Sequence, residues 1–225
     1  MPRNNDLWIL IGLALLSLVL ARLPLLNLLV YPFELFNTFI HEMSHILAAL
    51  ITGGRVERFE IYRDGSGVAL VRGGITWIVA SAGYLGSALV GGALLLLTSR
   101  GVAPRSVLLA LGVVLAIMGL LFVRNLFGML AGLALVAALI GAATKLEPRW
   151  SGALLLFLTV QMCLKSLDSL WDLLRISTSL RGRATTDAQI MQQITGVPGL
   201  VWALLWSAAA LLILWQSVRI AYFKG

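Results

Sequence analysis

The composition of this 225-residue chain is that of a membrane protein. Of its residues, 60% are hydrophobic and 12% are charged, and the mean hydropathy of +0.95 lies far above that of an ordinary soluble domain. The formal net charge of +7 comes mostly from arginines in predicted loops, and no basic run alternates with aromatic residues as in segments that bind nucleic acid. These values exclude a soluble globular domain and a nucleic-acid partner, and they favour anionic lipid headgroups as the partner of the basic residues.

Seven apolar segments predict an all-α polytopic membrane protein with about seven transmembrane helices, because about 20 apolar residues cross a bilayer. The segments are Leu7–Ala21, Pro32–Gly53, Ile75–Thr98, Ser106–Val123, Leu126–Ala143, Ser151–Leu174 and Gly199–Tyr222. Pro32 is well placed for a first helical turn. The connections are short, so we expect residues 1–225 to form a single integral membrane domain.

The second predicted helix carries the only two histidines of the chain, His41 and His45, in an H-E-x-x-H motif with Glu42. Residues i and i+4 lie on one helix face, so both imidazoles reach one tetrahedral metal ion while the glutamate lies beside its open position. Ionisable groups in a membrane are costly and are seldom kept without a partner. The motif therefore predicts a Zn²⁺ site and zinc-assisted hydrolysis. The alternative is a polar patch in which the histidines hydrogen-bond neighbouring helices.

The segment Arg55–Arg72, which follows the motif helix, has the pattern of a β-hairpin. Polar and apolar residues alternate around Phe59 and Ile61, a turn is expected at Asp64–Gly67, and a second strand at Val68–Val71. A hairpin beside a hydrolytic site offers an edge strand that holds an extended substrate by main-chain pairing. Phe59 and Ile61 are the candidate substrate-binding residues of that edge, and an interfacial cap without substrate contact is the alternative.

Small residues in the later helices indicate close helix packing. The third predicted helix contains Gly83, Ser87 and Gly91 at four-residue spacing, and the fifth contains Gly128 and Gly132. Such stripes let two helices approach each other. We predict a packing role for them, not a catalytic one.

A zinc site that keeps one position open for water needs a third protein ligand. Asp168 is the predicted ligand, because it lies about six residues before the end of its segment, at about the depth of the two histidines when a helix rises about 1.5 Å per residue. Asp172, one turn further on, is an alternative ligand or orients one. Ion pairing with Lys165 and Arg175 is the simpler interpretation of these two. Asp187 is the third candidate, for which helix capping is the simpler interpretation.

The distribution of basic residues predicts the orientation in the membrane. By alternation of the seven segments, nine arginines fall on the side of the hairpin and seven lysines and arginines on the other side. The positive-inside rule then places the hairpin and the mouth of the site on the cytoplasmic side.

The order of these features resembles the site-2 protease family of intramembrane zinc metalloproteases, and more narrowly its compact B-like branch of M50-type metallopeptidases. The resemblance rests on the H-E-x-x-H motif and on Thr52–Val56, Ala82–Ser87, the Asp168 and Asp172 pair, Thr186–Ala188, Pro198 and Trp202. It implies hydrolysis of peptide bonds in membrane-embedded or membrane-adjacent proteins or peptides. It also implies that His41 and His45 are zinc ligands and that Glu42 is the general base.

The chain departs from the better-studied branches at one point. Those branches take the third ligand from an Asp-Gly pair, and the only Asp-Gly here is Asp64-Gly65 in the hairpin. Two other classes of function therefore stay open, a catalytically inactive scaffold that binds client helices and a transporter of metal ions or protons. The sequence predicts no oligomeric state.

Overall fold

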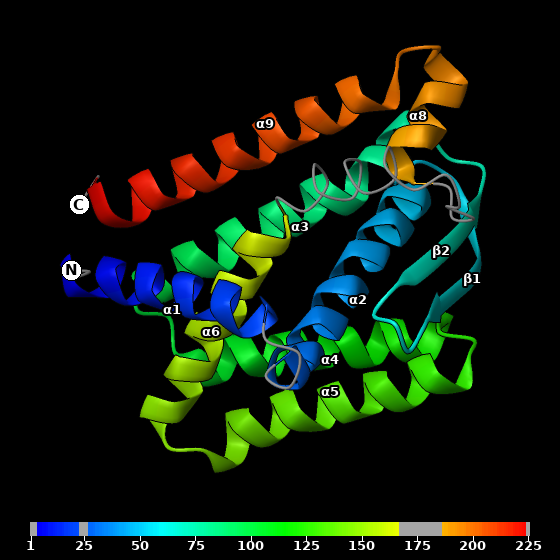
Figure 1. Ribbon diagram of the computed structural model, residues 1–225. Coiled ribbons are helices and arrows are strands. Elements are labelled where there is room, and N and C mark those ends of the chain that lie inside the picture. The colour runs from blue at the N-terminus through cyan, green and yellow to red at the C-terminus, as the bar shows by residue number, and fades with distance from the viewer. Residues whose placement is uncertain (1–3, 23–26, 167–185, 224–225) are drawn as a thin grey trace.

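The computed structural model describes residues 4–22, 27–166 and 186–223, and they form a helical bundle with a β-hairpin at one end (Figure 1). The helices are α1 (Asn4–Arg22), α2 (Asn27–Ile51), α3 (Thr76–Ser99), α4 (Pro104–Phe122), α5 (Leu126–Lys145), α6 (Pro148–Lys165), α8 (Asp187–Thr195) and α9 (Gly199–Val218), and the π-helical turn η1 (Arg219–Phe223) continues α9. The strands are β1 (Arg55–Ile61) and β2 (Gly67–Arg72). Helix and hairpin thus lie where the sequence pattern predicts them.

Four helices in the described part of the chain are long and apolar enough to cross a membrane, namely α3, α4, α5, and α9 together with η1. The mostly helical fold is confirmed, whereas the predicted number of about seven spans is not. The last part of the predicted segment Ser151–Leu174 lies outside the described residues. Helix α2 begins at Asn27, not at Pro32 as predicted. A proline in the second turn removes one helical hydrogen bond, the one to the Leu28 carbonyl, and the apolar residues before it still extend the helix.

Helix α2 runs through the centre of the molecule, where Phe36, Phe39 and Ile46 are fully buried. These residues belong to a main core that α2 shares with the hairpin and with α4, α5 and α6. A second, smaller core joins α3, α8 and α9 and consists of Ala80, Ala188, Met191 and Trp206. Figure 1 shows α9 along one side of the bundle, with α3 between α9 and α2. The hairpin end of α2 therefore lies where the two cores meet.

The hairpin is antiparallel, and Phe59 pairs with Ala69. Its β1 edge is already occupied, because the Arg124 N–H donates to the Phe59 carbonyl at 2.9 Å and the Asn125 side chain bonds both the N–H and the carbonyl of Ile61. The side chains of Phe59 and Ile61 are fully buried. The prediction that these two residues present a substrate-binding edge is therefore wrong. They anchor the hairpin in the main core, and β2 carries the other edge.

Candidate metal centre

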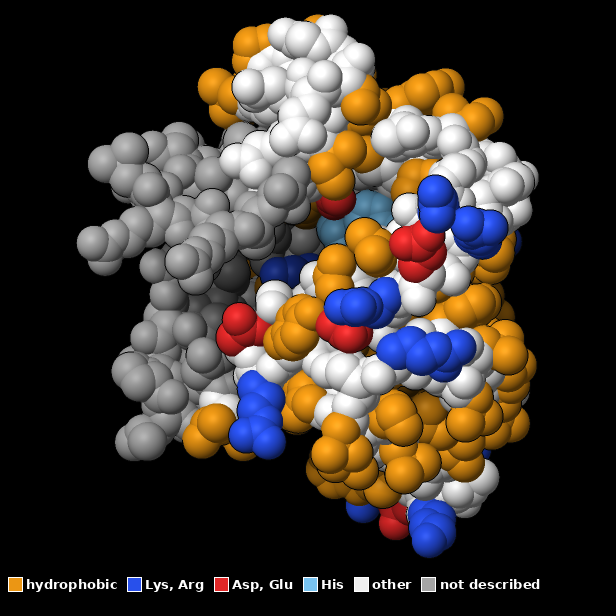
Figure 2. All heavy atoms as spheres, turned by 90° about the vertical axis from the view of Figure 1, so that its right-hand side faces the viewer, with side chains coloured by type: hydrophobic (Ala, Val, Ile, Leu, Met, Phe, Trp, Pro, Cys, Tyr) orange, Lys and Arg blue, Asp and Glu red, His pale blue; other side chains and the backbone are white. Residues whose placement is uncertain are grey.

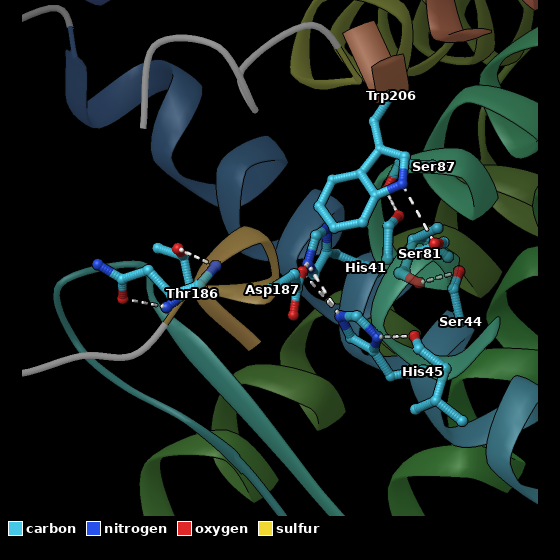
Figure 3. A network of polar contacts seen from close by, with 12 residues as sticks. His41, Ser44, His45, Ser81, Ser87, Thr186, Asp187 and Trp206 are labelled. Atoms are coloured by element: carbon cyan, nitrogen blue, oxygen red, sulfur yellow. Dashed lines mark hydrogen bonds and ion pairs between the residues drawn. The ribbon is translucent and has the colours of Figure 1, made fainter. Parts of the chain in front are cut away.

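Three side chains from two distant segments converge at the hairpin end of α2 (Figure 3). The Nε2 atoms of His41 and His45 lie 3.2 Å apart. Oδ2 of Asp187, the first residue of α8, lies 3.3 Å from each of them. Among the described residues this is the one cluster of three or more histidine, cysteine or acidic side chains that could hold a metal ion.

The cluster has the dimensions of a zinc site. Zinc bonds of about 2.0 to 2.1 Å place neighbouring ligands of a tetrahedron about 3.3 Å apart, and the three donor atoms here are separated by 3.2 to 3.3 Å. Two imidazoles and one carboxylate are donors that zinc accepts, and three protein ligands leave a fourth position open for water or substrate. The residues present therefore fit the metal that the motif predicts.

The tautomer of His45 also suits metal binding. Its Nδ1 lies 2.7 Å from the carbonyl oxygen of Val79 in α3. Because a carbonyl only accepts, Nδ1 carries the proton and Nε2 keeps its lone pair for a metal. A backbone partner of this kind fixes the ring orientation of a metal-binding histidine. Val79 itself could not be identified from the sequence, because any residue type supplies a carbonyl.

Helix capping explains how Asp187 reaches the histidines. The predicted capping role falls to its neighbour, since the Thr186 side chain accepts from the Gln189 N–H and the Gln189 side chain accepts from the Thr186 N–H. This capping box fixes the start of α8 and leaves the Asp187 carboxylate available to the histidines. Burial raises the pKa of this carboxyl, but when no metal is bound and the histidines are protonated, the charge of His45 and hydrogen bonds from His41 and His45 outweigh burial and hold the pKa below its usual value. Asp168 and Asp172, the other two candidates, lie outside the described residues.

Gly83 makes room for the two imidazoles. A Cβ built at this glycine would lie 2.5 Å from Cε1 of His41 and closer still to Nε2 of both histidines. The α3 backbone therefore forms one wall of the site, and only a glycine fits there. The sequence indicated Gly83 as one of several packing residues, and nothing in its four-residue spacing distinguishes it from Gly91.

Glu42 lies in the wall of a pocket of about 680 Å³ that also contains the histidines and Asp187. Its side chain is buried, and its carboxylate accepts a hydrogen bond from the Ala69 backbone of β2. The remaining walls come from β2, from the start of α3 and from the α8 segment, and most of their residues are apolar. Figure 2 shows the histidine surface in a hollow at the hairpin end, with hydrophobic side chains around it. The cluster thus lies in a pocket that β2 borders.

The comparisons with known proteins agree with this site. No curated protein and no solved structure matches the chain. The family model described as peptidase M50B-like matches residues 8–217, which is nearly the whole chain and contains every residue of the cluster. The resemblance inferred from the motifs is thereby confirmed, and with its apolar helices the chain is an integral membrane protein. The chain belongs to the peptidase M50B-like family.

Proposed function

We propose that this protein is an intramembrane zinc endopeptidase that hydrolyses peptide bonds of membrane-embedded or membrane-adjacent substrates. The observation that carries this proposal is the convergence of His41, His45 and Asp187 beside Glu42 in one open pocket. A polar patch of histidines bonded to neighbouring helices needs no such ligand spacing and no adjoining carboxylate. Membership of a peptidase family supports hydrolysis over transport or scaffolding.

Each residue of the cluster has a role in this chemistry. When bound, zinc supplies a Lewis acid that acidifies water and polarises a carbonyl group. His41, His45 and Asp187 hold the metal and leave a position open. Glu42 is not a ligand in this arrangement. It accepts the proton of the attacking water and returns it to the leaving amine, which is the work of a general base and then of a general acid.

The pocket favours an extended peptide as substrate. Phe59 of β1 and Ala69 of β2 are paired, and the Phe59 carbonyl points away from β2 to accept from Arg124. The Ala69 N–H correspondingly points away from β1, where it donates to Glu42. That edge of β2 lines the pocket. A substrate segment paired with it is held extended beside the general base. A transmembrane substrate must unwind locally to adopt this conformation, so helix-breaking residues near the cleaved bond favour cleavage.

We place the hairpin and the pocket mouth on the cytoplasmic side, as the charge bias predicts. The bilayer surrounds the apolar helices, and the partner in the pocket is a membrane protein or peptide. A cysteine introduced at the exposed Arg72 of β2 tests the orientation by its reaction with an impermeant thiol reagent in sealed, oriented vesicles. Labelling only after permeabilisation of right-side-out vesicles agrees with a cytoplasmic hairpin, whereas immediate labelling contradicts it.

The proposed activity is tested by zinc content and cleavage in the same preparations. Purified protein in detergent is expected to contain about one zinc per chain, and His41→Ala and His45→Ala are expected to lose it. Glu42→Gln should keep the zinc and lose cleavage of a reporter transmembrane peptide with a Gly-Pro break, assayed in proteoliposomes by mass spectrometry. Wild-type cleavage by Glu42→Gln would refute the general-base assignment. Zinc flux into the same proteoliposomes would support the transporter alternative instead.

The third ligand is tested separately, because the sequence ranks Asp168 first and the described cluster contains Asp187. Zinc is measured in Asp168→Asn, Asp172→Asn and Asp187→Asn, with Asp64→Asn in the exposed hairpin turn as the matched control. We expect the largest loss in Asp187→Asn and none in the control. A loss confined to Asp168→Asn would return the ligand role to Asp168.

A further inference from the structure

The two histidines of the cluster are supported in different ways. His45 is fixed by the hydrogen bond from its Nδ1 to the Val79 carbonyl. The hydrogen bonds of His41 within the described residues both involve Nε2, the atom that faces His45 and Asp187. Metal-binding histidines ordinarily donate their second ring nitrogen to a partner that sets the ring orientation. Within the part of the chain that the structure describes, the orientation of the His41 ring therefore has another source.

Aromatic side chains lie against the His41 ring instead. The Tyr84 ring meets it edge to face, with ring centres 4.8 Å apart and planes at 82°. The Trp206 ring stacks on Tyr84, with ring centres 5.6 Å apart and planes at 25°. Edge-to-face and offset-stacked pairs at these separations are the favoured aromatic geometries. The three rings thus form a continuous row from the metal-binding histidine to α9.

The far end of this row is itself fixed. Trp206 is 4% exposed, and its indole N–H donates to the Ser81 hydroxyl at 3.1 Å. Its ring also belongs to the second core, which contains Ala188, the residue after Asp187. One buried tryptophan is therefore linked to His41 through the Tyr84 ring and to the start of α8 through the second core.

We propose that Tyr84 and Trp206 are positioning residues that hold the His41 imidazole in its metal-binding orientation by ring contact, in place of a hydrogen bond. The proposal rests on the zinc site described above. Its specific content is that the ring of Tyr84 matters and its hydroxyl does not. A role of the hydroxyl in catalysis makes a different prediction, which is loss of cleavage with zinc retained when only the oxygen is removed.

The test is zinc affinity, measured by competition with a chromophoric chelator in detergent, together with helical circular dichroism to verify the fold. Tyr84→Leu and Tyr84→Met both remove the ring and are expected to weaken zinc binding about tenfold or more, in the range known for partners of metal ligands. Tyr84→Phe keeps the ring and is expected to bind zinc like the wild type. Trp206→Leu should weaken binding, whereas Trp215→Leu on the exposed side of α9, where the tryptophan is 60% exposed, should not.

Each result supports or overturns one statement. Wild-type zinc affinity in folded Tyr84→Leu or Tyr84→Met overturns the positioning role, as does equal weakening in Tyr84→Phe. Cobalt spectra of the loaded proteins give a second measure, since altered ligand-field bands in Tyr84→Met but not in Tyr84→Phe report a displaced His41. His41→Ala is the reference for the site itself. If His41→Ala retains full zinc, then the proposed metal site is wrong, a failure distinct from that of the aromatic row.

Discussion

The replacement of Gly83 by alanine tests the shape of the metal site most severely. The added Cβ would lie 2.5 Å from His41 Cε1, whereas real Cβ atoms essentially never approach a neighbour closer than 3.0 Å. The difference of 0.5 Å is the smallest displacement that relieves this contact, and the contacts with both Nε2 atoms require more. Metal sites tolerate deviations of about 0.2 Å in ligand distance. The rings therefore cannot stay in place around a metal ion.

The expected magnitude follows from the cost of overpacking a buried site, about 1 to 3 kcal/mol. If the overpacking destabilises the zinc-bound state and not the zinc-free state, zinc affinity falls about 5- to 150-fold. Cleavage falls with it when zinc is limiting. Chelator competition on purified protein measures the affinity. Gly141→Ala in α5 is the matched control, because nothing lies within 4 Å of its added Cβ and alanine is the better helix former. Unchanged zinc affinity in Gly83→Ala would refute the description of α3 as a wall of the site.

Three further tests, with substitutions at α8, at Asn125 and in β2, concern how the site and the hairpin are held. Thr186→Ala removes the α8 cap and is expected to lower the free energy of unfolding by about 1 kcal/mol and to weaken zinc binding, whereas Thr186→Ser should restore both. Calorimetry and chelator competition measure the two effects. Equal zinc affinity in the wild type and both variants would contradict this prediction. Asn125→Ala removes two hydrogen bonds to the Ile61 backbone and should lower the free energy of unfolding in detergent by about 1 to 3 kcal/mol. An unchanged unfolding midpoint would show that these two hydrogen bonds do not stabilise β1. Ala69→Pro removes the N–H that the Glu42 carboxylate accepts and should keep the fold and the zinc but slow cleavage, while Val68→Pro removes an N–H that faces β1 and should unfold the hairpin. Equal cleavage by Ala69→Pro and wild type would show that Glu42 does not need this hydrogen bond.

The sequence predicted the features that depend on local patterns. Apolar segments and a turn-rich alternating segment were sufficient for the helices and the hairpin, because burial in a membrane and turn chemistry leave few other solutions. His41 and His45 could be paired from spacing alone, since a helix fixes the geometry of residues four positions apart. The start of α2 was misplaced, because Pro32 was taken as a first-turn residue, whereas the apolar residues before it begin the helix at Asn27.

Features that depend on tertiary contacts were not predictable in the same way. Asp187 lies 146 positions from His41 in the chain, and only the docking of α8 on α3 and α9 brings its carboxylate to the histidines. Depth along a helix, the sequence argument for Asp168, carries no information about such a docked segment. The β1 edge at Phe59 and Ile61 is closed by the segment around Arg124 and Asn125, which lies more than 60 positions further along the chain. Alternation in a strand identifies the buried side chains but not which edge stays free.

The most direct test of the central claim is anomalous diffraction at the zinc absorption edge from crystals of the purified protein. The account predicts a single strong peak enclosed by Nε2 of His41, Nε2 of His45 and Oδ2 of Asp187, with Gly83 beside it and Glu42 close by but not bound to the metal. A zinc peak elsewhere, or one whose third protein ligand is a residue other than Asp187, would contradict it.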